Sequence, residues 1–348
     1  MNIPDHPLWR GVFAGPAALY GAAARLRSRL YAGGFLETVR WPMPVFCVGN
    51  LTVGGSGKTP VTLWLAERLK AAGRRPAVLS RGYGRRDRTP VFVPNQGDPL
   101  PGVDRLGDEP RLLASRLPGV PLSIDADRAA AAGRAWASGL ADCAVMDDGF
   151  QHRRLYRERD LLCLDARTAH AVFAGGRPTP WLPAGPWREK PAAGVRAAGW
   201  VFTRAERLSG AEKSALGAAG RPGGAPAFFA AYTLSFYDGP TGRPLPAGEL
   251  AGRGVLALSG VADPGGFEAA LTKSGARVRS ARFADHHLFT EGERARVADD
   301  ARRAGLRVVT TEKDWQRLPP DFPAVVARLD LRWEGEDPWA SAIESAFH

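Results

Sequence analysis

Residues 52–59 have the types and spacing of a phosphate-binding loop. They read Thr-Val-Gly-Gly-Ser-Gly-Lys-Thr, follow a short apolar stretch and precede a stretch with helical periodicity. Glycines let backbone N–H groups turn inward around phosphate oxygens, and the start of a helix adds a favourable dipole. The pattern predicts that Lys58 meets the β- and γ-phosphates of ATP and that the Thr59 hydroxyl ligates Mg²⁺. The predicted nucleotide-binding residues are Thr52, Gly54, Gly55, Ser56, Gly57, Lys58 and Thr59.

One position departs from the usual Gly-x-x-x-x-Gly-Lys-Ser/Thr pattern, because Thr52 stands where the first glycine is expected. A glycine-rich turn without a ligand is therefore the alternative interpretation of this loop. The remaining positions and the flanking strand and helix favour a nucleotide.

Two consecutive carboxylates, Asp147 and Asp148, end the apolar run 143–146. Ligands of open α/β sheets bind at the carboxyl ends of strands, and a carboxylate there commonly holds the magnesium ion of a bound nucleotide. We therefore expect this pair to face Mg²⁺ across the loop at 52–59. The alternative is a charged strand end in solvent.

Short apolar stretches alternate with helical ones along most of the chain. This alternation predicts a largely parallel sheet with helices on both faces, so the expected fold class is α/β and similar to that of P-loop NTPases. It restarts after residue 250 and predicts a second, smaller α/β lobe. The strands are expected at 44–49, 76–80, 120–124, 144–146, 161–164, 200–203, 254–259, 277–283 and 306–311, and the helices after Lys58 and at about 109–117, 127–138, 265–274 and 291–303.

An uncharged run of fourteen residues, 11–24, lies near the start of the chain. As a helix it reaches about 21 Å, which is short of the roughly 30 Å of a hydrocarbon core. Aromatic and arginine side chains surround it: Trp9, Phe13, Tyr20, Arg25, Arg27, Arg29, Tyr31, Phe35 and Trp41. This combination favours a helix lying in the headgroup region of a membrane. An ordinary packed helix is the alternative, and a signal peptide is disfavoured because Asp5 stands where a basic region is required.

The composition is that of a folded protein without a cysteine framework. With 348 residues, of which 45% are hydrophobic and 24% charged, the chain allows about two domains and excludes wholesale disorder. Cys47, Cys143 and Cys163 lie inside apolar runs, so we expect neither disulfides nor a zinc cluster. The net charge of +11 favours an anionic partner, but only six of the 47 basic residues are lysine, so arginine-rich composition explains the charge equally well.

Seven short segments stand out along the chain: 48–52 (VGNLT) with the loop that follows, 80–83 (SRGY), 107–110 (GDEP), 147–153 (DDGFQHR), 182–186 (LPAGP) with Arg188 and Glu189, 285–287 (DHH) and 310–314 (TTEKD). In this order they resemble the segments of one family, the tetraacyldisaccharide 4'-kinases, which phosphorylate the lipid A precursor. The resemblance spans residues 44 to 315, which is nearly the whole chain.

The resemblance implies a two-lobed fold with MgATP in the cleft and transfer of the γ-phosphoryl group to the 4'-hydroxyl of a tetraacyldisaccharide 1-phosphate. It implies location at the cytoplasmic face of the inner membrane, with the lipid A disaccharide precursor and that membrane surface as partners and without nucleic acid or an obligate protein partner. The expected domains are a membrane-associated segment at 1–40, a P-loop kinase domain at 41–235 and the smaller lobe at 236–348. The chain departs from the family at Trp187 and Lys190, where leucine and proline are usual, and at Trp315.

Residue roles follow from the family positions. Asp108 is the expected catalytic base, paired with His286, and Lys58 is the third catalytic residue. Glu109 joins Thr59, Asp147 and Asp148 as an expected magnesium ligand. The substrate-binding residues carried over are Asn50, Arg81, Gln151, Arg128 and Arg188. The alternatives are a helix cap for Asp108, surface loop histidines for His286 and its neighbour, and solvated surface positions for the two last-named arginines.

Two other classes of function remain open from the residues alone. A membrane-associated ATPase switch also combines such a loop with a membrane helix. Its loop carries a signature lysine, however, and this chain has Val53 at that position. A nucleic-acid-dependent ATPase fits the net charge, yet the sequence has no recognisable nucleic-acid-binding motif. Both are less favoured than the kinase.

Overall fold

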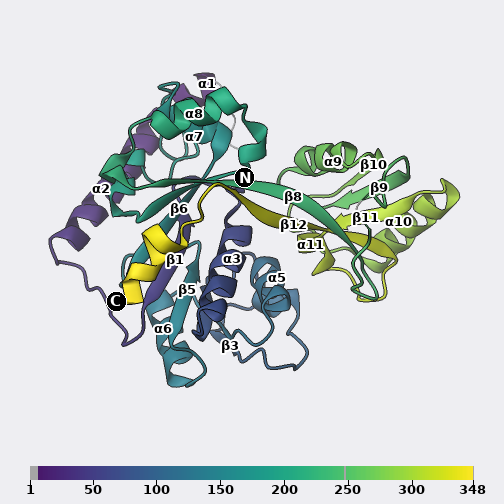
Figure 1. The fold of residues 1–348 in the computed structure, drawn as a ribbon, viewed down its shortest axis with the longest axis horizontal. Coiled ribbons are helices and arrows are strands. Elements are labelled where there is room, and N and C mark those ends of the chain that lie inside the picture. The colour runs from purple at the N-terminus through teal and green to yellow at the C-terminus, as the bar shows by residue number, and fades with distance from the viewer. Residues whose placement is uncertain (1–6, 247, 348) are drawn as a thin grey trace.

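A computed structural model describes residues 7–246 and 248–347; the first six residues of the predicted N-terminal segment, Asp5 among them, lie outside the described residues. The chain forms a larger and a smaller lobe, joined by the long strands β8 (Ala227–Asp238) and β12 (Ala324–Glu334) (Figure 1). These two strands pair antiparallel from Phe229↔Glu334 to Asp238↔Val325. The smaller lobe is therefore inserted between two neighbouring strands that leave the larger lobe together.

One sheet of twelve strands runs through both lobes, in the order β10-β9-β11-β12-β8-β7-β6-β1-β5-β2-β4-β3. The remaining strands are β1 (Val45–Asn50), β2 (Pro76–Ser80), β3 (Val91–Val93), β4 (Leu122–Ile124), β5 (Cys143–Asp147), β6 (Arg159–Asp165), β7 (Gly199–Thr203), β9 (Gly254–Ser259), β10 (Arg277–Arg282) and β11 (Arg307–Thr311). All pairs are parallel except β8 with β12 and β3 with β4. The predicted α/β class and its parallel sheet are confirmed, whereas β3, β8 and β12 were not predicted.

Helices cover both faces of the sheet. They are α1 (Pro7–Val12), α2 (Ala14–Ala32), α3 (Lys58–Ala71), α4 (Val103–Leu106), α5 (Asp108–Arg116), α6 (Arg128–Ala137), α7 (Ala166–Phe173), α8 (Gly210–Ala218), α9 (Pro264–Lys273), α10 (Glu291–Arg303) and α11 (Glu312–Trp315). Short helical turns are η1 (Pro191–Arg196), η2 (Ala205–Arg207), η3 (Pro222–Gly224), η4 (Trp339–Ile343) and η5 (Glu344–Phe347).

Alternate residues of the buried strands enter different cores, as the pleat requires. On β1, Phe46 and Val48 pack with α3 and α5, whereas Val45 and Cys47 pack with α6. On β9 of the smaller lobe, Val255 faces the core beneath α9, and the next residue faces the core beneath α10. Burial on both faces explains why these strands read as continuous apolar runs in the sequence. The three cysteines are free and buried in strands, as predicted.

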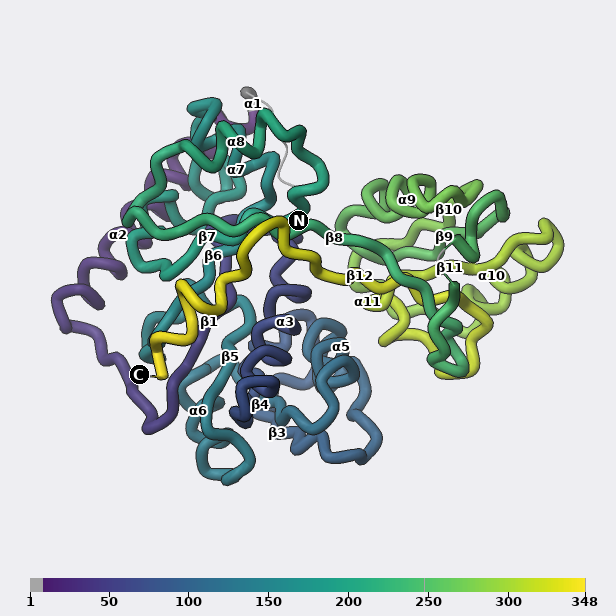
Figure 2. The backbone as a smooth tube through the Cα atoms, in the orientation of Figure 1, coloured from purple at the N-terminus to yellow at the C-terminus, as the bar shows by residue number. Residues whose placement is uncertain are grey.

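The segment after β12 returns to the larger lobe (Figure 2). Trp339 and Ile343 belong to the core that contains Phe46, and the ring of Phe347 lies 5.3 Å from that of Phe46. A single boundary at 235/236 therefore leaves out these contacts.

The N-terminal helices α1 and α2 lie along the outside of the larger lobe (Figure 1). The indole of Trp9 donates to the carbonyl of Pro183 (3.0 Å), and Gly21 packs so closely on Trp181 that an added Cβ lies 2.8 Å from that indole. The other side carries exposed apolar residues, with Leu19 at 75% and Leu26 at 59% exposure. Among the described residues, no helix has the length and apolar character needed to span a bilayer.

Candidate active site

The phosphate loop lies between β1 and α3, where the sequence predicts it. Gly54 and Gly57 have φ of +99° and +70°, a region that L side chains rarely adopt, so the loop requires glycine at both positions. Lys58 is the first residue of α3, with Gly57 as its N-cap. The loop is therefore at a helix N-terminus, where backbone N–H groups and the helix dipole attract phosphate.

Neighbouring segments hold the entrance of the loop. The side-chain amide of Asn50 donates to the Ser56 hydroxyl (2.8 Å), and Gln151 donates to the carbonyl of Asn50 (2.9 Å). The N–H of Arg188 donates to the carbonyl of Leu51 (2.7 Å). Thr52 pairs through its backbone with Trp187, so the unusual first residue of the loop is fixed by another backbone segment.

Asp147 and Asp148 lie beside the loop because β1 and β5 are parallel neighbours in register, with Val48 opposite Asp147. Asp147 is 5% exposed and accepts a hydrogen bond from Thr62 on α3 (2.9 Å). Asp148 forms ion pairs with Lys58 (3.4 Å) and Arg188 (3.2 Å).

The two carboxylates have different electrostatic surroundings. Burial and the charge of Glu109 raise the pKa of Asp147 to about 7, although Lys58 opposes this. Burial also acts to raise the pKa of Asp148, but Lys58 and Arg188 outweigh it and lower that pKa. A solvated strand end does not agree with this burial.

The negative charges of Glu109 and Asp148 both act on the buried Asp147, whose pKa they raise, so the three carboxylates lie close together. Such oxygen donors suit a hard cation, and magnesium in kinase sites needs only one or two carboxylates beside water and substrate phosphates. The residues present therefore fit a magnesium ion. Within the described part of the chain, no three His, Cys, Asp or Glu side chains form a metal site by themselves. Thr59 lies in the first turn of α3, and its predicted role as a ligand stays a prediction.

Asp108 and His286, which are 178 residues apart in the chain, form a hydrogen-bonded pair across the two lobes. Oδ2 of Asp108 lies 2.9 Å from Nδ1 of His286, and its Oδ1 accepts the N–H of Glu109 (2.9 Å). Burial acts to raise the pKa of Asp108, but the bond to His286 and the charge of Lys313 outweigh it and hold that pKa below its usual value. Asp108 is therefore a carboxylate at neutral pH, as a proton acceptor must be.

Lys313 and Arg317 also face this pair, and no role for either was predicted. Nζ of Lys313 lies 3.3 Å from Glu109, 3.7 Å from Asp108 and 3.5 Å from Nε2 of His286. An ammonium group only donates, so Nε2 of His286 accepts and Nδ1 carries the proton that it donates to Asp108. Lys313 lies in the TTEKD segment of the sequence, which was the available signal, whereas Arg317 lies outside every matching segment.

The other predicted residues occupy different places. Arg128 is 5% exposed and close enough to Arg81, Asp147 and Asp148 for their charges to affect its pKa, which burial lowers. Arg81 itself is exposed. His287 does not face Asp108, because it pairs with Glu293 (2.9 Å) at the start of α10. Of the two histidines, the structure thus brings only His286 to Asp108, whereas His287 packs between the rings of Phe283 and Phe289.

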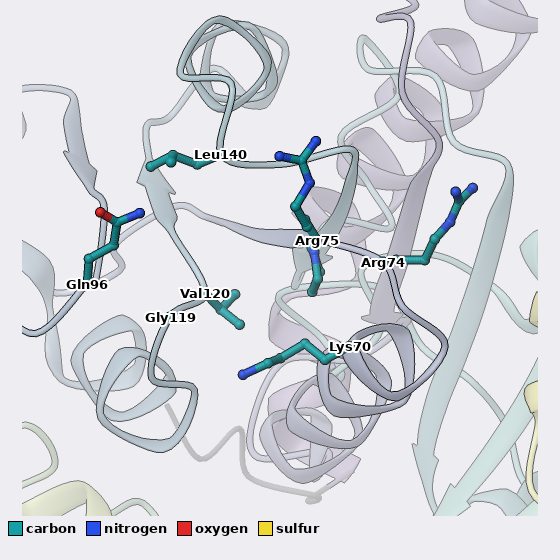
Figure 3. Close-up of a pocket in the computed structure, with 8 residues that line it drawn as sticks. Lys70, Arg74, Arg75, Gln96, Gly119, Val120 and Leu140 are labelled. Carbon is teal, nitrogen blue, oxygen red and sulfur yellow. The ribbon is translucent and has the colours of Figure 1, made fainter.

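Figure 3 shows a cavity of about 250 Å³, and Lys70 is among the residues that line it. Since Lys70 is in the last turn of α3, this cavity lies at the end of the helix away from the phosphate loop. Its basic side chains have protein partners: Lys70 donates to the carbonyl of Pro118 (3.0 Å), and Arg75 pairs with Asp142 (3.5 Å). This cavity does not belong to the site.

Comparison with known proteins identifies the family. The model of the tetraacyldisaccharide-1-P 4'-kinase family matches residues 12–348. A tetraacyldisaccharide 4'-kinase of Anaeromyxobacter sp. (strain Fw109-5) is 42% identical over 340 residues, covering 94% of this chain and 89% of the relative. The corresponding protein of Anaeromyxobacter dehalogenans (strain 2CP-C) is 45% identical over 313 residues, covering 88% and 81%.

A solved structure of LpxK from Aquifex aeolicus in complex with ATP has a TM-score of 0.78 and 29% identity, covering 97% of this chain and 99% of that one. The family model covers both lobes and the whole site, and the relatives and the solved structure cover between 88% and 97% of the chain. The chain therefore belongs to the tetraacyldisaccharide-1-P 4'-kinase family.

Proposed function

We propose that this protein transfers the γ-phosphoryl group of ATP to the 4'-hydroxyl of a tetraacyldisaccharide 1-phosphate. Its family membership and its similarity to an ATP-bound LpxK support this function. The observation that carries the proposal is the approach of the Asp108–His286 pair to a phosphate loop: Glu109, next to Asp108, is close enough to Asp147 to raise its pKa. A proton acceptor and a nucleotide site thus share one edge of the sheet.

The loop and its lysine bind and orient the triphosphate. N–H groups at the start of α3 and the Lys58 ammonium group face the phosphates and balance their charge. Lys58 must then exchange its ion pair with Asp148 for a phosphate contact. We propose that Arg81, Arg128 and Arg188 meet anionic groups of the two substrates, and that Asn50 and Gln151 act by holding the entrance of the loop.

Asp108 accepts the proton of the 4'-hydroxyl. At the same time the hydroxyl oxygen bonds to the γ-phosphorus, and the bond between that phosphorus and the leaving ADP oxygen breaks. His286 holds the Asp108 carboxylate through Nδ1–H and keeps its orientation. Glu109, Asp147, Asp148 and Thr59 would hold magnesium, which when bound supplies charge neutralisation on the phosphates.

Turnover of labelled ATP with three kinds of addition tests the function. The purified protein is incubated with a tetraacylated disaccharide 1-phosphate, with single- or double-stranded nucleic acid, or with neither. We expect label in the disaccharide and little ATP hydrolysis otherwise. Turnover that depends on nucleic acid, or that is the same without any acceptor, would contradict the proposal.

We also propose that α2 attaches the protein to the cytoplasmic face of the inner membrane. Leu19 and Leu26 are exposed seven residues apart on α2, which places them along one stripe of that helix, and Val12 at the end of α1 and Phe35 beyond α2 are also exposed. The exposed residues Arg25, Arg27 and Arg29 lie on the same helix, and Arg27 also donates to the carbonyl of Gln151 (2.9 Å). Apolar and basic groups act together at an anionic lipid surface, and ATP is available on the cytoplasmic side.

Co-sedimentation with vesicles containing phosphatidylglycerol tests the attachment. The double variant Leu19→Glu, Leu26→Glu should lose most of the bound fraction. Leu329→Glu, at an exposed position on β12, is the matched control and should bind like the unchanged protein. If the double variant binds as well as this control, another surface makes the contact.

The domain division needs one change from a simple cut. We propose that 41–235 and 328–347 together form the kinase lobe, because Trp339 and Ile343 pack in the core of β1 and α3. The smaller lobe then comprises about 236–327, since Phe236, Val325 and Ala327 pack in its core and the ends of this segment pair as part of β8 and β12.

A further inference from the structure

Three consecutive carbonyl groups of the phosphate loop accept hydrogen bonds from side chains outside the loop. The donors lie on β7, directly after β7 and on β8. The carbonyl of Gly55 accepts from the Arg204 guanidinium group (2.7 Å), and that of Ser56 accepts from the Thr203 hydroxyl (2.8 Å). The carbonyl of Gly57 accepts from the phenol of Tyr232. The donors follow the loop by about 150 residues or more, so this arrangement depends on the tertiary fold.

These bonds fix the direction of the loop's N–H groups. A trans peptide is planar, and its N–H points opposite to its carbonyl. With the carbonyls of Ser56 and Gly57 turned toward β7 and β8, the N–H groups of Gly57 and Lys58 are turned to the other side. N–H groups directed in this way are the ones that bind phosphate oxygens in such loops.

Tyr232 and Thr203 are buried, and their surroundings leave them little freedom. Tyr232 is 8% exposed, and Thr203 is fully buried. The N–H of Tyr232 donates to Glu206 (3.0 Å), which fixes its backbone. A Cβ added to Gly57 would lie 2.6 Å from the Tyr232 oxygen, so the ring is in tight contact with the loop backbone.

We infer that Tyr232 and Thr203 are positioning residues of the phosphate loop: their hydroxyls set its carbonyls and thereby aim the N–H groups of Gly57 and Lys58 at the phosphates. This inference rests on the proposed function in one respect, that the loop binds ATP. Neither residue touches the nucleotide in this role, so each acts through the loop backbone.

Removal of each hydroxyl at constant shape tests the inference. Tyr232→Phe and Thr203→Val delete one donor each, and Tyr237→Phe on β8 and Thr310→Val on β11 are matched controls. One hydrogen bond corresponds to about a 2- to 12-fold change in an equilibrium constant. We expect the dissociation constant of a non-hydrolysable MgATP analogue, measured by calorimetry without lipid, to rise by that factor for each variant and by less than twofold for each control.

Thr203→Ser retains the hydroxyl and should restore the affinity that Thr203→Val loses, which a mere packing role would not do. Steady-state kinetics should show a higher KM for MgATP and an unchanged KM for the lipid acceptor. Analogue affinities of Tyr232→Phe and Thr203→Val within twofold of the unchanged protein would overturn the inference. If the unchanged protein binds the analogue but does not phosphorylate the disaccharide, the proposed function fails and the inference stands.

Discussion

Replacement of Asp108 by asparagine removes the proton acceptor while keeping its shape. The carboxylate is 4% exposed, bonded to His286 and the N–H of Glu109, and faces Lys313 at 3.7 Å. General-base assistance is worth about 10²–10⁴-fold in rate, which at about 1.4 kcal/mol per tenfold corresponds to a barrier increase of about 3–6 kcal/mol. We expect Asp108→Asn to lower kcat by at least 10²-fold and to leave the affinity for a MgATP analogue within a few-fold.

The measurement compares kcat, KM and analogue affinity with those of Asp285→Asn. Asp285 lies near the same groups, 3.7 Å from His286 and 3.9 Å from Lys313, so this control removes a similar charge without removing the base. It should lose less than tenfold in kcat. A kcat within tenfold of the unchanged protein for Asp108→Asn would refute the assignment. A raised dissociation constant for MgATP at unchanged kcat would place Asp108 in the metal site.

His286→Ala should lower kcat less than Asp108→Asn, because a residue that orients the base leaves the carboxylate in place. The double variant should be no slower than Asp108→Asn alone, since two groups that act as a unit have non-additive effects. If the two single-variant losses in kcat multiply in the double variant, His286 has a role separate from that of Asp108.

Three further predictions concern the loop, the N-terminal helix and acid stability. Lys58→Ala should abolish phosphoryl transfer in a folded protein, while Lys70→Ala at the other end of α3 should be as active as the unchanged protein; near-normal turnover of Lys58→Ala would contradict the loop assignment. Gly21→Val should separate α2 from the indole that it contacts and speed tryptic cleavage in that helix, whereas Gly15→Val, with open space around it, should not. Burial lowers the pKa of His152 from its usual 6.5 to about 4 in the folded protein. As the pH is lowered below 6.5, this histidine is protonated in the unfolded chain before it is in the folded one, so the free energy of unfolding falls. His152→Gln should reduce that fall by about 1 kcal/mol between pH 7 and pH 5 in urea unfolding, after allowance for the part of the ring that water screens; an unchanged fall would contradict it.

Most parallel strands of the fold were predictable from the sequence because they contain continuous runs of apolar residues. Parallel strands such as β2 and β9 are buried on both faces and appear in the sequence with their observed bounds. The ribbon of β8 and β12 was not predictable in this way, since its strands pair across about ninety residues of intervening chain. Local periodicity carries no information about such a partner.

The residues of the site likewise fall into those that local sequence predicts and those that only the tertiary structure brings together. The phosphate loop and Asp147 follow from spacing along the chain, because one strand and one turn position each of them. The pairing of Asp108 with His286 came from the resemblance to a family, and the contacts of Lys313 with both appear only in three dimensions. The donors Thr203 and Tyr232 left no signal, because a buried hydroxyl on a strand is indistinguishable in sequence from any other strand residue.

The insertion of the smaller lobe between β8 and β12 determines the order in which the protein is completed during synthesis. The core around Phe46 and α3 needs Trp339, Ile343 and Phe347, and these residues leave the ribosome after the whole of the smaller lobe. Part of the apolar core of the larger lobe therefore stays exposed while the smaller lobe is synthesised and folds. A long-lived exposed core is a target for chaperones, so slow translation of the inserted segment should increase aggregation of the unfinished chain.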